Sequence, residues 1–247
     1  MVGDRAVVAF VGAGGKTTAM FLLSRELRED GAAVVITTTT RILVPPASSD
    51  TAVVVEDDDG RLLDAVAEVL RHGRAPVAGR ATTADGKLVG IAPEVVADLA
   101  RLPGVTHVLV EADGAARRPL TAPRDGEPVI PAAATIVVPV VGIEALGAPL
   151  SAVSHRPERV MALTGLGSAA RLDAAAIARV MLDAEGNVRG TPPGARIVPL
   201  VNKVDGPERI GAARQLAAEL RRSGAERVVI AALEAEAPIV EVIATEA

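Results

Sequence analysis

The sequence predicts an α/β fold in which helices cover a mainly parallel central sheet. Two observations lead to this prediction: apolar runs rich in Val and Ile recur along the chain, and helical patterns separate most of them. Alternation of this kind builds parallel sheets with helices on their faces. With 247 residues, 49% of them hydrophobic, the chain can bury one large core or two small ones. We predict a single domain, 1–247.

Runs of β-branched residues and amphipathic patterns place the individual elements. The predicted strands are 6–11, 33–38, 52–55, 106–110, 134–140, 196–201 and 227–232. The predicted helices are 16–29, 61–71, 93–101, 171–184 and 207–222. Gly31 and Gly224 stand where helices should stop. Asp205 is expected to cap the last helix, which has Pro207 in its first turn.

Three segments depart from this alternation. Residues 76–91 hold the turn Ala84-Asp85-Gly86-Lys87 between short extended pieces, which predicts a hairpin inserted at the sheet edge. A helical insertion is expected around 142–190. The acidic run at 56–60 is interpreted as a solvated turn and helix cap rather than as a metal site.

Composition narrows the classes of function. A net charge of −5 without a basic run argues against nucleic acid as a partner. Charged residues, Pro or Gly interrupt every apolar stretch and the chain starts with a strand, so we expect a cytoplasmic protein and no membrane partner. The chain has no Cys and three scattered His, which argues against thiol chemistry and a His-based metal site. Because only Phe10 and Phe21 are aromatic, a nucleobase must be held by hydrogen bonds, aliphatic contacts or an Arg plane.

The most informative segment is the glycine-rich loop after the first predicted strand. It reads G-A-G-G-K-T-T and comprises Gly12, Ala13, Gly14, Gly15, Lys16, Thr17 and Thr18. A strand that leads through glycines into a helix predicts a phosphate-binding loop and a P-loop NTPase-like fold. Lys16 is expected at the β- and γ-phosphates, and the Thr17 hydroxyl at Mg²⁺. The alternative is an ordinary glycine turn with Lys16 in solvent.

This loop departs from the common pattern G-x-x-x-x-G-K-[ST], because Phe10 stands where that pattern needs a glycine. The shorter form G-x-x-G-K-T-T resembles the loop of the Mur-type ATP-dependent ligases.

Acids and arginines follow the predicted strand 106–110. Glu111 and Asp113 are two residues apart, so in an extended chain both side chains point to one face. One is expected to hold Mg²⁺ and the other to orient a water or an acceptor; the alternative is that they cap a turn. Arg117 and Arg118 suit an anionic substrate or the charge on a transferred phosphoryl group, unless they are ordinary surface residues.

Two other strand ends carry polar residues. Thr39, Thr40 and Arg41 follow the second predicted strand and could meet the γ-phosphate or a metal-bound water, although threonine also forms strands well. N-K-V-D supplies Asn202, Lys203 and Asp205, and it resembles the guanine-reading motif of GTPases. The choice between guanine and another base, or no base at all, stays open.

Taken in order, five segments resemble the YqeC family, described as accessory proteins of selenium-dependent molybdenum hydroxylases. They are G-A-G-G-K-T-T at 12–18, T-T-T-T-R at 37–41, E-A-D-G-A-A-R-R-P-L at 111–120, S-H-R-P-E at 154–158 and N-K-V-D at 202–205. The resemblance runs over nearly the whole chain. It implies a nucleotide-binding protein that helps to mature a molybdenum hydroxylase or its cofactor, with that enzyme or its maturation proteins as partners. The matching residues transfer as nucleotide-site residues.

Three hypotheses of function follow. The first is an Mg²⁺-dependent NTPase or phosphotransferase that uses ATP or GTP. The second is a GTP-switched chaperone or insertion factor, in which hydrolysis only resets the conformation. The third is an ATP-dependent ligase that acts through an acyl phosphate. The second substrate and the oligomeric state stay open.

Overall fold

The computed structural model describes residues 2–46 and 48–244, and its centre is a ten-stranded sheet. In spatial order the strands are β15 (Ile239–Ala244), β14 (Arg227–Ala231), β13 (Leu200–Asn202), β10 (Ile136–Gly142), β1 (Ala6–Gly12), β8 (His107–Glu111), β2 (Val34–Thr38), β5 (Ala75–Gly79) and β4 (Thr51–Val55), with β12 (Arg196–Ile197) also paired to β10. Every pair in this sheet is parallel except β14 with β15. The predicted mixed α/β fold with a mainly parallel sheet is therefore confirmed.

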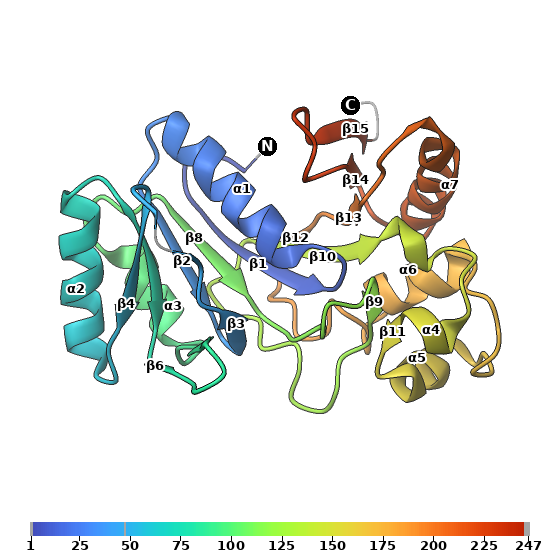
Figure 1. The fold of residues 1–247 in the computed structure, drawn as a ribbon, viewed down its shortest axis with the longest axis horizontal. Helices are drawn as coiled ribbons and strands as arrows, with labels where there is room; N and C mark the ends of the chain where they lie inside the picture. Colours follow the sequence, from blue (N-terminus) through green and yellow to red (C-terminus); the bar gives the residue numbers. More distant parts are fainter. Residues whose placement is uncertain (1, 47, 245–247) are drawn as a thin grey trace.

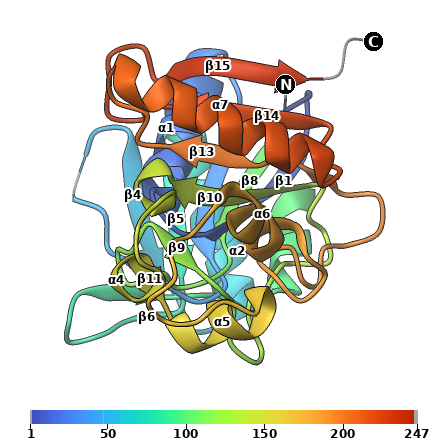
Figure 2. The same cartoon turned by 90° about the vertical axis from the view of Figure 1, so that its right-hand side faces the viewer.

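Helices cover both faces of the sheet (Figures 1 and 2). The helices that pack on the sheet are α1 (Lys16–Glu29), α2 (Asp59–Arg71), α3 (Val95–Arg101), α6 (Ala174–Leu182) and α7 (Pro207–Arg222). In β1, Val8 and Phe10 share an apolar cluster with α1, while the alternating residues Val7, Ala9 and Val11 share one with α2 and α3. Successive strand side chains point to opposite faces, so α1 lies on one face and α2 and α3 on the other.

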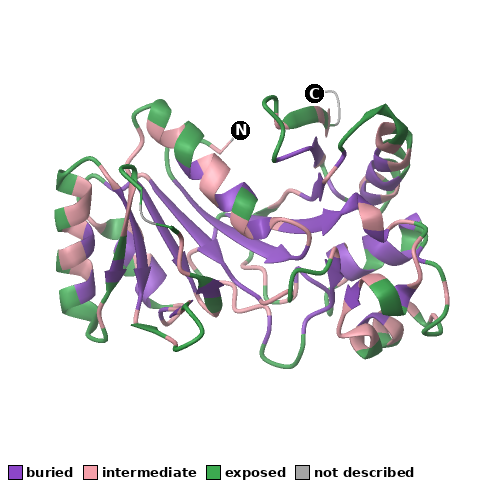
Figure 3. Ribbon diagram, in the orientation of Figure 1, coloured by how far each residue is buried: buried purple, intermediate pink, exposed green. Residues whose placement is uncertain are grey.

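The carboxyl-terminal helices extend the face that carries α2 and α3. Val137 of β10 belongs to the cluster with α2 and α3, and Val141 of the same strand belongs to the cluster with α6 and α7. The two residues are four apart in one strand and therefore point to the same side. The strands between these layers are largely buried, as Figure 3 shows in purple.

Short elements stand beside the carboxyl ends of the central strands (Figure 1). An antiparallel three-stranded sheet consists of β3 (Arg41–Leu43), β7 (Lys87–Val89) and β6 (Ala81–Thr82). Across from it lie η1 (Ile143–Ala145), α4 (Leu150–Val153), α5 (Pro157–Thr164) and the parallel pair β9 (Leu120–Thr121) with β11 (Ser154–His155). The segment 142–190, expected to be a helical insertion, contains η1, α4, α5 and α6. No helix among the described residues has the length and apolar character needed to cross a membrane.

Two element predictions need correction near prolines and caps. The predicted strand 196–201 is two strands, β12 and β13, which are separated at Val198 and Pro199. Proline has no N–H to donate to a ladder, which accounts for the break. The predicted cap Asp205 is also wrong: Gly206 is the N-cap of α7 with φ +90°, and the Asp205 carboxylate lies 3.6 Å from Arg209 instead.

Other caps are as expected. The Asp58 side chain accepts a hydrogen bond from the Arg61 N–H at the start of α2, which confirms the acidic run as a helix cap. Gly31 and Gly224 follow the last residues of α1 and α7 with positive φ. The predicted helix 171–184 is shorter, because the Asp173 side chain caps α6 by accepting from the Ala176 N–H.

The segment 76–91 is only partly the expected hairpin. Its hairpin is the pair β6 and β7, but its first residues form β5, which lies inside the central sheet between β2 and β4. The strand reads A-P-V-A-G, and Ala, Pro and Gly are depleted in strands, so the local composition concealed it.

Candidate functional site

The glycine loop lies where β1 meets α1, and close contact with β10 fixes its shape. Gly12, Gly14 and Gly15 have φ values of +87°, +83° and +134°, which L-residues with a side chain rarely adopt. A Cβ on Gly14 would lie 2.2 Å from the backbone N of Gly142, and one on Gly12 would lie 2.5 Å from the carbonyl O of Val140. These two positions therefore exclude any side chain.

The amino terminus of α1 has free backbone donors. Gly15 is the N-cap and provides no side-chain hydrogen bond, and the first bond inside the helix runs from the Ala19 N–H to the Gly15 carbonyl O at 2.9 Å. The N–H groups from Gly15 to Thr18 precede that bond and have no acceptor within the helix. The four residues line a common cleft. Together with the helix dipole, these donors make a ready anion-binding site.

Lys16 and two carboxylates form a buried triad behind this terminus. The Lys16 side chain is 3% exposed, and its Nζ lies 3.0 Å from Asp113 Oδ1 and 3.8 Å from Glu111 Oε1. It also donates to the Gly12 carbonyl O at 2.5 Å. Thr17 Oγ1 donates to Glu111 Oε2 at 2.6 Å, and Asp113 Oδ2 accepts from the Gly12 N–H at 2.7 Å. The two acids therefore point to one face, as the sequence predicted.

Burial sets the protonation chemistry of the triad. Desolvation by itself would lower the pKa of Lys16, but the carboxylates of Asp113 and Glu111 raise this pKa more, so it lies above its usual value. Burial raises the pKa of both Glu111 and Asp113, and the Lys16 ammonium offsets only part of that effect. The site holds one firmly protonated lysine between two carboxyl groups that would gain from a further cation.

The two acids differ in access. Glu111 lines the cleft, whereas Asp113 is fully buried and lies outside that lining. Asp113 thus anchors Lys16 and the loop backbone from behind, while Glu111 and Thr17 offer their oxygens to the cleft.

Asn202 ties the glycine loop to the carboxyl-terminal part of the sheet. Its Nδ2 donates to the Gly14 carbonyl O at 2.8 Å, and its Oδ1 accepts from the Leu233 N–H at 3.1 Å. Lys203 has φ +64° and pairs with Glu144 at 2.8 Å. Asn202 and Lys203 line the cleft; Asp205 does not, and its side chain is 60% exposed. Of the three residues predicted from N-K-V-D, the structure brings Asn202 and Lys203 to the cleft but not Asp205.

Hydroxyl groups fix the segment after β2. Thr39 Oγ1 donates to the Val129 carbonyl O at 2.7 Å, and the Thr40 N–H donates to Thr38 Oγ1 at 3.0 Å. Thr38 Oγ1 in turn donates to the Glu111 carbonyl O at 2.7 Å. Thr39, Thr40 and Arg41 line the cleft; the two threonines make the hydrogen bonds above, and Arg41 pairs with Val89 of β7 in the small sheet. Thr38 entered the sequence analysis only as part of T-T-T-T-R, without a role of its own, and it links this segment to β8.

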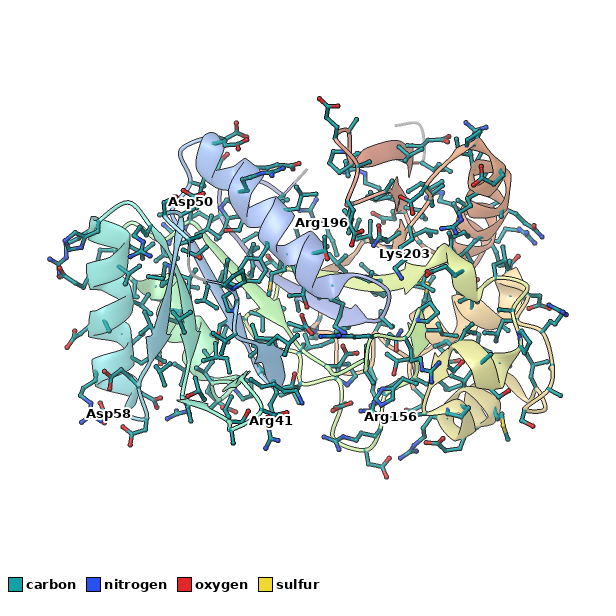
Figure 4. The ribbon with its side chains drawn as sticks, viewed as in Figure 1. Arg41, Asp50, Asp58, Arg156, Arg196 and Lys203 are labelled. Atoms are coloured by element: carbon teal, nitrogen blue, oxygen red, sulfur yellow. The ribbon has the colours of Figure 1, made fainter. Side chains whose placement is uncertain are left out.

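These elements enclose an open cleft of about 1470 Å³ at the carboxyl ends of the central strands. The glycine loop forms one wall, β3 with the segment after β2 forms a second, and the loops around Arg117, Arg124 and Arg156 form a third. Figure 4 shows Arg41 and Arg156 at the lower margin of the ribbon, and Lys203 closer to the start of α1. Arg117 and Arg118, which the sequence singled out, both line the cleft.

Four further residues of this wall had no individual role assigned from the sequence: Arg124, Glu127, His155 and Arg156. Glu127 is 5% exposed, and it pairs with Arg124 Nε at 3.0 Å and Arg156 Nη1 at 2.8 Å. His155 and Arg156 belong to S-H-R-P-E, which carried the family resemblance without an assigned chemistry. That segment was the signal available to find them.

Comparison with known proteins adds the family. A sequence model of the family described as "YqeC protein" matches residues 8–158, more than half of the chain. The chain belongs to the YqeC family. A YqeC relative from Escherichia coli (strain K12), named "Uncharacterized protein YqeC", is 31% identical over 144 residues, which are 58% of this chain and 56% of that protein. The match thus spans little more than half of the relative.

The YqeC match covers the glycine loop, the threonines after β2, the Glu111–Arg118 segment and S-H-R-P-E. It ends at Glu158, so N-K-V-D at 202–205 lies outside the matched region. The region that the family model matches therefore contains most residues of the cleft lining and all three residues of the buried triad.

Proposed function

We propose that this YqeC protein binds a nucleoside triphosphate, ATP or GTP, with Mg²⁺ and hydrolyses or transfers its γ-phosphate. One observation carries the proposal: four backbone donors without helical acceptors belong to residues that line the same cleft as Lys16. Donors and a cation in this arrangement stabilise the charge of a phosphoryl group during transfer. The role in maturing a molybdenum hydroxylase is part of the proposal and rests on the family alone.

The charge of the triad favours binding of the nucleotide together with a divalent cation. With both carboxyl groups ionised, Lys16, Glu111 and Asp113 carry one net negative charge, which repels a bare polyphosphate. The Glu111 carboxylate and the Thr17 hydroxyl are hard oxygen ligands of the kind that Mg²⁺ prefers. No group of three or more acids, His or Cys suited to a metal occurs in the described part of the chain. Magnesium would then take its remaining ligands from phosphate and water, and it would neutralise the charge of the γ-phosphate.

Each group of residues in the site has its own role in this proposal. The N–H groups of the α1 terminus bind phosphate oxygens, and Lys16 binds the transferring group after turning from its carboxylate partners. Asp113 keeps the Lys16 ammonium within reach and holds Gly12 through its N–H. The segment from Thr39 to Arg41 closes one side of the site, where it limits access of bulk water.

The first experiment measures phosphate release from ATP and GTP by the wild type and by Lys16→Ala, with and without Mg²⁺. We expect release to need Mg²⁺ and to fall by about 100-fold or more in Lys16→Ala, because the variant loses a charge that acts on the transferring group. Arg25→Ala, on the exposed face of α1, is the matched control and should release phosphate like the wild type. Unchanged release from a folded Lys16→Ala protein would refute the proposal.

Further measurements test the role of Mg²⁺ and distinguish the three hypotheses of function. Thr17→Val keeps the side-chain shape and removes the hydroxyl, so calorimetry should show nucleotide binding with a weaker dependence on Mg²⁺. Turnover that appears only with a partner enzyme would favour a nucleotide switch. ADP formation that needs both a carboxylate and an amine would favour a ligase.

A further inference from the structure

The cleft extends well beyond the glycine loop. Pockets that bury one drug-sized ligand measure about 300–1,000 Å³. This cleft measures about 1470 Å³, and its lining reaches from Gly14 to Arg156 and the 124–127 segment. It therefore has room for a second small molecule beside a nucleotide.

The lining is strongly cationic in a chain that is acidic overall. The cationic residues of the lining are Lys16, Arg41, Lys87, Arg117, Arg118, Arg124, Arg156 and Lys203. The acidic residues are Glu111, Asp125, Glu127 and Glu234. The whole chain has a formal net charge of −5, so the excess of four cations is a local property of the cleft. A concave surface of one charge concentrates ligands of the opposite charge.

Backbone strain is concentrated at the same place. In the described part of the chain, the non-glycine residues with positive φ are Ala116 at +45°, Arg117 at +58°, Arg156 at +62° and Lys203 at +64°. All four line the cleft, and three of them are cationic. Such conformations cost about 1–3 kcal/mol each and persist where the surrounding structure enforces them. The fold thus aims these cations at the cleft at an energetic cost.

The cations differ in whether they already have an anionic partner. Lys203 pairs with Glu144, and Arg124 and Arg156 share Glu127. Arg41 and Arg117 make no ion pair or side-chain hydrogen bond with any described residue. Two guanidinium groups therefore remain available, one from β3 and one from the strained loop after β8.

We infer that Arg41, Arg117 and Arg156 form a subsite for a second substrate, a small organic anion with a phosphate or carboxylate group. The planar guanidinium fork binds both oxyanions through two parallel hydrogen bonds. Glu127 acts as a positioning residue, because its buried carboxylate holds Arg156 and Arg124 in place. The neighbouring site takes its nucleotide from the proposed function, but the anion subsite depends only on its own residues.

The test uses the protein saturated with ADP and Mg²⁺, so that the glycine loop is filled. Ligand-observed NMR then follows titration with two probes, glycerol 3-phosphate and succinate, which distinguish a phosphate from a carboxylate. We expect one probe to bind the wild type. Arg117→Gln and Arg41→Gln should each weaken its binding about 10- to 100-fold, the effect of losing a charge-assisted contact. Arg25→Gln, outside the cleft, should bind like the wild type.

The outcomes separate this inference from the proposed function. If ADP does not bind the wild type, the proposed function fails, but probe binding that depends on Arg117 still supports the subsite. If neither probe binds the wild type, or if the probe that binds the wild type binds Arg117→Gln equally well, the subsite is refuted. If Arg117→Gln loses ADP instead of the probe, Arg117 belongs to the nucleotide site and the inference is overturned.

Discussion

Two walls of the cleft, the glycine loop and the wall around Arg117 and Arg156, both contain residues with positive φ, but the residue types differ. The glycine loop uses residues without a side chain, Gly12, Gly14 and Gly15, and presents backbone N–H groups. The facing wall places Arg117 and Arg156 in the same region of backbone space and presents their guanidinium groups. The first wall offers main-chain groups and avoids strain, whereas the second offers side-chain groups and tolerates strain.

This difference shows which kind of site tolerates change. A backbone site depends on an empty volume, so an added methyl group is its most damaging alteration. A side-chain site depends on particular charged groups, so it can lose function while keeping or gaining stability. The substitutions below test whether the two walls respond in these opposite directions.

The largest effect is expected for Gly14→Ala. Its Cβ would lie 2.2 Å from the backbone N of Gly142, and φ is +83°, so strain and overlap add up. We expect the free energy of unfolding to fall by about 3 kcal/mol or more, measured by urea denaturation. Gly31→Ala is the matched control: φ is +86° but no atom lies within 4 Å, so it should cost only about 1 kcal/mol. Equal losses would show that the loop can yield to β10.

A middle effect is expected for Asn202→Ala, which removes the tie between the loop and Leu233. The Leu233 N–H would lose its partner in a buried place and the Gly14 carbonyl O in a partly buried one, so we expect a loss of about 2 kcal/mol in urea denaturation. Nucleotide affinity should fall as well. Asp205→Ala, at the exposed end of N-K-V-D, should change stability by less than about 0.5 kcal/mol. Calorimetry with GTP and ATP on the same control protein tests guanine: an unchanged preference would remove Asp205 from base recognition.

The smallest effect, with the opposite sign, is expected for Arg117→Gly. Glycine adopts φ +58° without strain, so the variant should unfold at the same or a slightly higher urea concentration, with a gain of up to about 1 kcal/mol. The anion probe should still bind more weakly, because the guanidinium is gone. A clear loss of stability would mean that Arg117 packs in a structural role and that the two walls do not differ.

Much of the fold was predictable because buried strands are recognisable in the sequence as apolar runs. The strands β1, β2, β4 and β8 are runs rich in Val and Ile, and Asp58 and Gly31 marked helix ends correctly. The strand β5 was hidden because its A-P-V-A-G sequence carries weak strand signals and is held by its neighbours β2 and β4. Tertiary contacts, rather than local preference, decide such a strand.

In the candidate site, too, local sequence predicted some residues and only tertiary contacts determine the others. The glycine loop, Glu111 and Asp113 were predictable because a short segment carries the motif and the strand period fixes the direction of the acids. Glu127 and its two arginines were not, since Arg124 is near Glu127 in sequence but Arg156 arrives from another loop, and only folding joins them. Likewise, the sequence gives no indication that Asp205 faces away from the cleft while Asn202 faces into it.

The bond from Asn202 to Gly14 spans 188 positions of the chain. During synthesis on the ribosome the glycine loop emerges well before its partner Asn202, and Leu233, whose N–H holds Asn202, emerges later still. A nascent chain therefore carries an unfinished loop until both of these residues have emerged. A polypeptide cut short between the loop and Asn202 would lack the tie that completes the loop.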